Sequence, residues 1–180
     1  MQKLMLLAVI LLGIQLVQAA AVDRESAVVH AAELADPTAA LYVGVARRDV
    51  AEVRLAIANN ADVNALDVLG RTALIGVVQD YRHVRVVTEI VELLLSARAK
   101  VDAVDRRGLT ALWWAVSRRQ SGAVRLLLEA GADISTNSGS RSPLEIARIN
   151  AGSTDLGESG QDRARVIVSM LEEFNDNVAI

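Results

Sequence analysis

Between Asp105 and Thr136, hydrophobic residues fall into two short runs at helical spacing, and polar residues or glycines separate the runs. The first run follows a turn around Gly108 and begins at Thr110, and the second ends at Gly131. Hydrophobic residues three and four positions apart predict a helix with one apolar face. Because neither helix can bury that face alone, the pattern predicts that copies of this unit stack on both sides of it.

The same pattern recurs upstream in the chain. The first run, TALWWAV, is echoed by two segments with the sequences TALIGVV and AALYVGV, at Thr72–Val78 and Ala39–Val45. The second run, LLLEAGADIS, is echoed by LLLSARAKVD and LAIANNADVN, at Leu93–Asp102 and Leu55–Asn64. The equivalent leucines Leu41, Leu74, Leu112 and Leu144 are 33, 38 and 32 residues apart. The chain is therefore an array of units with a period near 33 residues.

A unit of this length, with two helices and a Gly-bearing turn, resembles the ankyrin repeat. The resemblance implies an all-α ankyrin-repeat solenoid of about four helix-turn-helix repeats with short β-hairpin-like finger loops. It covers residues 37–174, with repeats expected at 37–66, 67–104, 105–136 and 137–174. The family's Thr-Pro-Leu-His box reads AALY, TALI, TALW and SPLE here, and the residues in place of His are Tyr42, Ile75, Trp113 and Glu145. The hydrogen bonds of that His must therefore be replaced or lost.

Capping residues predict where the helices begin and end. Asp36 and Pro37 suit the first turn of the first inner helix, and Thr72 suits the cap of the second. Asn60 stands where the family usually has Gly, and Asn is the second choice for a left-handed helix end. These residues predict helices over about 38–46 and 50–58 in the first repeat.

Two segments depart from the regular pattern. The second repeat is five residues longer than the period, and the surplus falls in Gln79–Val87, so its outer helix is expected at Glu89–Ser96. After Asn150, a Gly/Ser-rich stretch of about eleven residues predicts a loop. A final helix at Arg163–Phe174 would then cap the array, with a frayed tail over residues 175–180.

The N-terminus has the pattern of a secretory signal peptide over residues 1–19. Lys3 precedes an apolar run at Leu4–Leu16, and small residues lead to a cleavage site after Ala19, with Ala21 as the alternative. A membrane anchor is the competing interpretation, but a span needs about 20 apolar residues. We expect export to a bacterial periplasm, no stable membrane insertion after cleavage, and a lead-in or cap over residues 20–36.

Composition removes several classes of function. The chain has no cysteine, which excludes a disulfide framework and a thiol nucleophile. No phosphate-binding loop, GxSxG elbow or metal-ligand spacing occurs, and the two histidines stand alone, so we expect no enzyme, no cofactor and no metal site. Without Lys3, 18 basic and 22 acidic side chains remain, a net charge of −4, which argues against nucleic-acid binding.

The resemblance implies that another protein binds to the finger tips and the inner-helix face. Carried onto this chain, it selects eight residues as partner contacts: Leu69, Arg71, Arg106, Arg107, Leu109, Trp113, Trp114 and Arg118. Trp and Arg are the residues most enriched in binding hot spots. The competing interpretations are that the tryptophans fill gaps between inner helices and that the arginines form a solvated face. A basic surface would favour a partner with an acidic surface.

We therefore expect a non-enzymatic, periplasmic protein-binding module, monomeric when alone. Binding would serve either as immunity or inhibition, by blocking a secreted toxin or a cell-wall hydrolase, or as support for a stress-defence enzyme. The sequence does not separate these two roles.

Overall fold

The computed structural model describes residues 36–79, 84–135, 141–153 and 157–178. The expected signal peptide and all of the expected lead-in except Asp36 lie outside these residues. Within the described part, no helix is long and apolar enough to cross a membrane.

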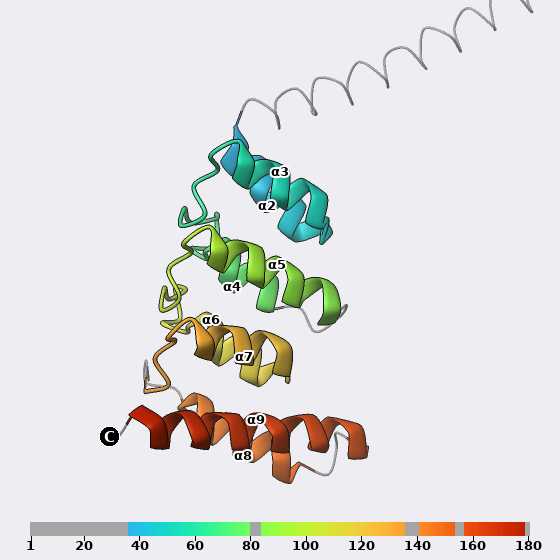
Figure 1. Cartoon of the computed structure of the whole chain (residues 1–180), viewed down its shortest axis with the longest axis vertical. Coiled ribbons are helices and arrows are strands. Elements are labelled where there is room, and N and C mark those ends of the chain that lie inside the picture. The colour runs from blue at the N-terminus through green and yellow to red at the C-terminus, as the bar shows by residue number, and fades with distance from the viewer. Residues whose placement is uncertain (1–35, 80–83, 136–140, 154–156, 179–180) are drawn as a thin grey trace, which may run out of the picture.

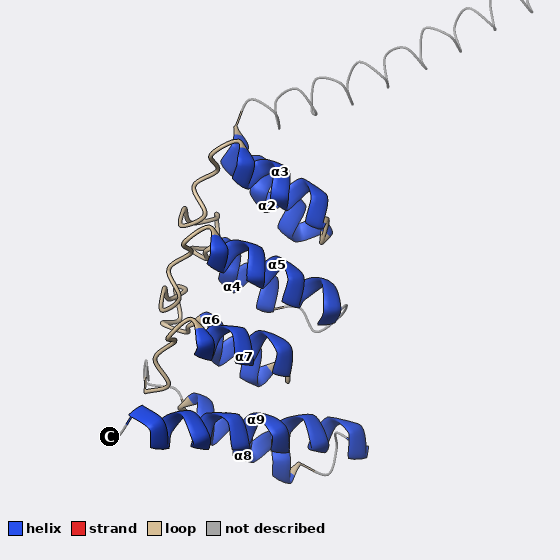
Figure 2. Cartoon of the chain, in the orientation of Figure 1, coloured by secondary structure: helices blue, strands red, loops and turns tan. Residues whose placement is uncertain are grey.

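The described residues form four helical hairpins stacked along one axis (Figures 1 and 2). Each hairpin pairs an inner with an outer helix: α2 (Pro37–Arg47) with α3 (Val50–Ala58), α4 (Ala73–Val78) with α5 (Val84–Ser96), α6 (Ala111–Ser117) with α7 (Ser121–Glu129), and α8 (Pro143–Gly152) with α9 (Gly157–Val178). Inner helices contact inner helices of the neighbouring pairs, and outer helices contact outer ones. The all-α solenoid of four repeats is confirmed.

Side-chain caps begin the inner helices where the sequence predicts them. The Asp36 carboxylate accepts a hydrogen bond from the Thr38 N–H, while Thr72 and Thr110 accept from the N–H three residues onward. In α8, Ser142 and Glu145 bond to each other's backbone N–H in a capping box. Because each of these bonds is local, the residue type alone was sufficient to predict the start of each helix.

The outer helices end alike despite different residues. Asn60, Arg98 and Gly131 have φ values of 64°, 64° and 83°. The N–H of the next residue, an alanine in each repeat, bonds back to a carbonyl five residues earlier at 2.9–3.0 Å. This bond stabilises a left-handed end even at Arg98, where the side chain makes that conformation unfavourable. The prediction for Asn60 is confirmed.

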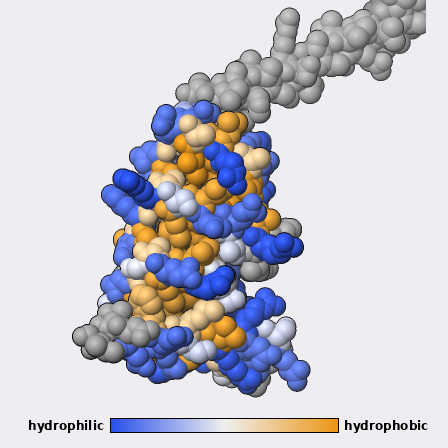
Figure 3. Space-filling model, in the orientation of Figure 1, coloured by the Kyte–Doolittle hydropathy of each residue, from blue (hydrophilic) through white to orange (hydrophobic). Residues whose placement is uncertain are grey.

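The apolar core runs through all four pairs. Leu41, Leu74 and Leu112, at the third position of each box, are at most 1% exposed. On the face carrying the outer helices, hydrophobic residues form a band along the long axis, with hydrophilic residues beside it (Figure 3). The first two finger loops, residues 67–71 and 105–109, line one edge of the array (Figure 1), and the second closes with a single β-bridge between Val104 and Thr110.

Two of the predicted helices have the wrong bounds. Helix α5 begins at Val84, five residues before the expected start at Glu89, so the irregular segment is shorter. Helix α9 begins at Gly157 and continues to Val178, so it includes residues 157–161 of the predicted Gly/Ser-rich loop and residues 175–178 of the predicted frayed tail. Ala164, Ile167 and Leu171 of α9 are at most 1% exposed. Burial of this face stabilises a helix whose first turns have poor intrinsic propensity.

Candidate functional site

The first two finger loops are built around equivalent aspartates. One oxygen of Asp67 accepts hydrogen bonds from the N–H groups of Leu69 and Arg71, both at 2.8 Å. One oxygen of Asp105 accepts from Arg107 at 2.8 Å and Leu109 at 3.0 Å. A carboxylate that accepts two backbone bonds holds the turn in one conformation.

The second oxygen of each aspartate has a different partner. Asp67 accepts two hydrogen bonds from the Arg71 guanidinium, at 2.8 and 2.7 Å. Asp105 instead accepts one from the indole N–H of Trp114, at 3.0 Å. The first finger thus fixes an arginine at its base, whereas the second fixes a tryptophan on the neighbouring inner helix.

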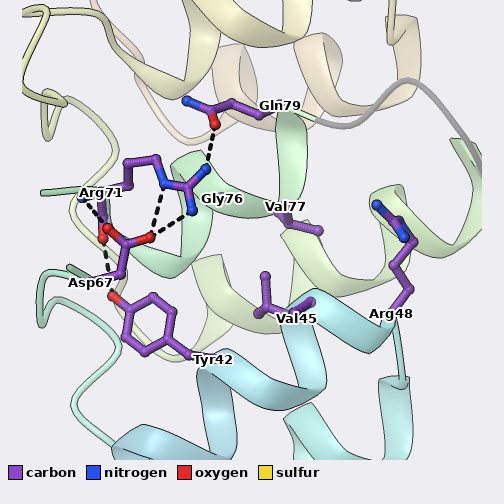
Figure 4. Close-up of a pocket in the computed structure, with 9 residues that line it drawn as sticks. Tyr42, Val45, Arg48, Asp67, Arg71, Gly76, Val77 and Gln79 are labelled. Carbon is purple, nitrogen blue, oxygen red and sulfur yellow. Dashed lines mark hydrogen bonds and ion pairs between the residues drawn. The ribbon is translucent and has the colours of Figure 1, made fainter. Parts of the chain in front are cut away.

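Arg71 also donates to the side-chain oxygen of Gln79 at 2.6 Å, so its guanidinium bridges the finger and the end of α4 (Figure 4). Burial alone would raise the pKa of Asp67, but the hydrogen bonds and charge of Arg71 outweigh burial and lower it. Burial, with the nearby negative charge of Asp67, raises the pKa of Tyr42 to about 12. Tyr42 is therefore a neutral hydrogen-bond donor at ordinary pH.

In two repeats, another side chain at the position of the missing box histidine makes a hydrogen bond to the next repeat. The Tyr42 hydroxyl donates to the backbone carbonyls of Ala65 and Arg71, the latter at 3.1 Å. The Trp113 indole N–H donates to the carbonyl of Arg141 at 2.9 Å. Arg71 and Arg141 both immediately precede the helix cap of the next repeat, so different side chains make equivalent bonds between repeats. Ile75, at the same box position, has no polar atom with which to do so.

A pocket of about 250 Å³ lies where the first two fingers meet the inner helices. It is lined by Leu69, Arg71, Gln79, Asp105, Arg106, Arg107 and Trp114. The structure therefore brings together five of the eight residues selected from the sequence. A sixth, Arg118, lies over the Trp114 ring at 5.6 Å from its centroid.

Contacts hold the cationic side chains of this pocket in place. The Arg107 guanidinium lies 5.4 Å from the centroid of the Trp114 ring, within the range of a cation–π interaction. Arg106 donates to the Val68 carbonyl at 3.0 Å, and its stem covers Gly70, where a Cβ atom would lie 2.7 Å from it. Among the described residues, neither Arg106 nor Arg107 forms an ion pair.

The remaining two selected residues lie elsewhere. Leu109 is only 2% exposed, so its assignment as a partner contact is corrected. Its side chain is buried at the base of the second finger, where the equivalent residue of the first finger is the polar Arg71. Trp113 is half-buried and packs edge-on against Trp114, with centroids 5.2 Å apart and an interplanar angle of 82°. Both tryptophans are half-buried, and Trp114 packs against the apolar core.

A second pocket, of about 330 Å³, was not anticipated from the sequence. Figure 4 shows Arg48 on one side and the Arg71–Asp67 pair on the other, with Val45 and Val77 between them. Gly76 also lines it, at the box-relative position that Trp114 occupies in the next repeat. The sequence signal that could have predicted this pocket is a glycine at the position where the next repeat has a tryptophan, because a residue without a side chain leaves space on the inner-helix face.

No group of three or more His, Asp or Glu side chains in the described part of the chain is placed to hold a metal ion. The fold and the pocket together define a class of protein, a helical-hairpin solenoid with finger loops and a basic, tryptophan-containing pocket beside them.

The comparisons place this class in a family. A family model described as ankyrin repeats, three copies, matches residues 41–138 and, overlapping them, residues 84–155. The chain belongs to the ankyrin-repeat family. Ankyrin repeats generally mediate protein–protein interaction, and the family is typically non-enzymatic. The comparison with curated proteins finds no match.

Proposed function

We propose that this chain is an exported, periplasmic protein-binding module whose contact surface lies across the second and third repeats. The observation that carries the proposal is the pocket that gathers Arg106, Arg107 and Trp114 from one repeat with Leu69 and Arg71 from the preceding one. Tryptophan and arginine held in a pocket are the residues that contribute most to binding energy when a partner covers them.

The finger tips support the same surface. Val68 is 88% exposed and Leu69 is 53% exposed, at the end of the first finger. Exposed apolar side chains next to fixed charges are typical of a protein interface, in which the apolar residues contribute burial and the charges contribute orientation. The periplasmic setting is supported by the leader pattern in residues 1–19, with small residues before the cut after Ala19.

The test is capture of partners from periplasm by the tagged mature chain, followed by mass spectrometry. Arg106→Gln with Arg107→Gln is expected to lose the specific partner. The control variant is Arg163→Gln with Arg165→Gln, which removes the same amount of charge from two exposed positions on α9. This control should still capture the partner. Equal capture by both double variants would reject the assigned surface.

N-terminal sequencing tests export separately, with a mature chain that begins at Ala20 as the expected result. A chain that keeps Met1 and stays in the cytoplasm would contradict it. The captured protein also separates the two roles, because a toxin or cell-wall hydrolase supports inhibition, whereas an oxidoreductase supports stress defence.

A further inference from the structure

The two pockets beside the finger loops are neighbours with a common wall. Arg71 and Gln79, joined by their 2.6 Å hydrogen bond, line both of them. One pocket therefore lies on each side of this pair, and both open between the fingers and the inner helices. Neither pocket alone has room for more than a few side chains, but a bound peptide segment that crosses the Arg71–Gln79 pair would contact both pockets.

The pockets differ in the chemistry of their walls. The middle of the larger one is formed by Val45, Ala46, Gly76 and Val77, which present hydrocarbon or no side chain at all, between Arg48 on one side and the paired Arg71 and Asp67 on the other. The smaller one contains Arg106 and Arg107 beside Trp114, with Arg118 over the same ring. An apolar side chain suits the first pocket, and a carboxylate suits the second.

Neither Asp105 of the smaller pocket nor Asp67 of the larger one forms an ion pair with Arg106 or Arg107. Asp67 accepts from Arg71 and from two backbone N–H groups, and Asp105 accepts from two backbone N–H groups and Trp114. The whole chain carries a net charge of −3, yet this surface is locally positive. An acidic segment would be steered to this surface in preference to the rest of the molecule.

We propose that the two pockets together recognise an extended acidic segment of the partner protein, which places an apolar side chain against Gly76 and a carboxylate against Arg106 and Arg107. This inference rests on the proposed protein-binding function and specifies its ligand. Extended backbone suits the surface because side chains two positions apart project from the same face, so that alternate positions of a segment crossing the wall can reach the two pockets.

Gly76 offers a direct way to block the larger pocket. A Cβ atom built on Gly76 meets only a Val45 methyl group at 3.8 Å, which is ordinary van der Waals contact. Gly76→Leu should therefore fill the pocket without displacing the backbone. Because glycine weakens a helix interior, the variant should also unfold at a temperature no lower than that of the wild type.

The experiment selects short random peptides displayed on phage against the full mature chain. The strongest are then synthesised with a fluorophore for anisotropy titration. We expect peptides that combine Asp or Glu with a large apolar residue. Arg106→Gln with Arg107→Gln should weaken their binding roughly tenfold or more, and added salt should weaken it further. Gly76→Leu should weaken binding at low and high salt alike, and Arg163→Gln with Arg165→Gln should leave it unchanged.

Neutral or basic peptides, or acidic peptides bound equally well by every variant, would overturn the inference. If no peptide is enriched while capture of a whole partner still depends on Arg106 and Arg107, a folded surface occupies the site. That result overturns the extended segment and leaves the protein-binding function standing. If capture of the partner does not depend on Arg106 and Arg107, the proposed surface itself is refuted. Circular dichroism of each variant verifies that it is folded.

Discussion

The buried carboxylate of Asp105 offers the sharpest test of how the second finger is held. It accepts backbone hydrogen bonds from Arg107 and Leu109 on one oxygen and the Trp114 indole N–H on the other. Asp105→Asn keeps one acceptor oxygen, so both backbone bonds can persist. Its amide nitrogen is a donor, however, and cannot accept from the indole. The substitution therefore removes one bond of the three.

The structure sets the size of the effect. A hydrogen bond to a charged group contributes about 1.5–3 kcal/mol, and Trp114 is only half-buried, so Asp105→Asn should lower the free energy of unfolding by about 1–2 kcal/mol. Asp105→Ala leaves all three donors without their acceptor and should lower it by about 3 kcal/mol. Urea titration followed by circular dichroism measures both values.

The same chemical change has a control elsewhere in this chain. Asp102 uses one oxygen to accept the Asp133 N–H at 2.9 Å. In the first repeat, Asn64 accepts the Lys100 N–H at 2.7 Å with its amide oxygen. Since asparagine already serves at the equivalent position, Asp102→Asn should change stability by less than about 0.5 kcal/mol.

Tryptophan fluorescence supplies a second readout. In a Trp113→Phe background, Asp105→Asn should alter the emission of Trp114, because the ring loses the contact that orients it. Two results would refute the reasoning: equal destabilisation by Asp105→Asn and Asp105→Ala, or a neutral Asp105→Asn with unchanged Trp114 emission. Either would show that the indole bond does not hold the ring.

Three further predictions concern the first two repeats. Ultraviolet titration should show a tyrosine that ionises near pH 12, absent in Tyr42→Phe; a single ordinary transition near pH 10 would contradict the buried hydrogen-bonded hydroxyl. Gly76→Ala should raise stability by about 0.5–1 kcal/mol, whereas Gly44→Ala should lower it, because its Cβ would lie 3.0 Å from a backbone nitrogen; thermal unfolding in the reverse order would refute the packing. The pKa of Asp67 is lowered in the folded state, so its pairing with Arg71 stabilises the fold at pH values above the ordinary carboxyl pKa. This stabilisation is lost as the pH falls through the folded-state pKa, and Arg71→Leu should therefore lose less stability than the wild type over this range. Acid unfolding in which both proteins lose stability equally steeply would disprove the coupling.

Local residues were sufficient to predict the repeats because the bonds that define them lie within a few positions. Thr72 and Thr110 cap the helices that they immediately precede, and Gly70 and Gly108 have positive φ in the finger turns. Asn60 ends its helix in the left-handed conformation for the same local reason. Sequence could likewise select Arg106, Arg107 and Trp114, since all three lie on one finger and the inner helix that directly follows it.

What depends on stacking could not be predicted in this way. Helix α9 begins early because its apolar face packs on α8, and local Gly and Ser residues indicate only a loop. Leu109 shares a finger with two exposed arginines, yet the fold buries it. The pocket beside Gly76 exists because this residue, which has no side chain, stacks next to Val45 and Ala46 of the preceding inner helix. Local sequence therefore specifies the repeat and its turns, whereas the stacking of the repeats specifies which of their side chains come into contact, because contacts such as Tyr42 with Arg71, Trp113 with Arg141 and Arg106 with Val68 join residues 28 to 38 positions apart.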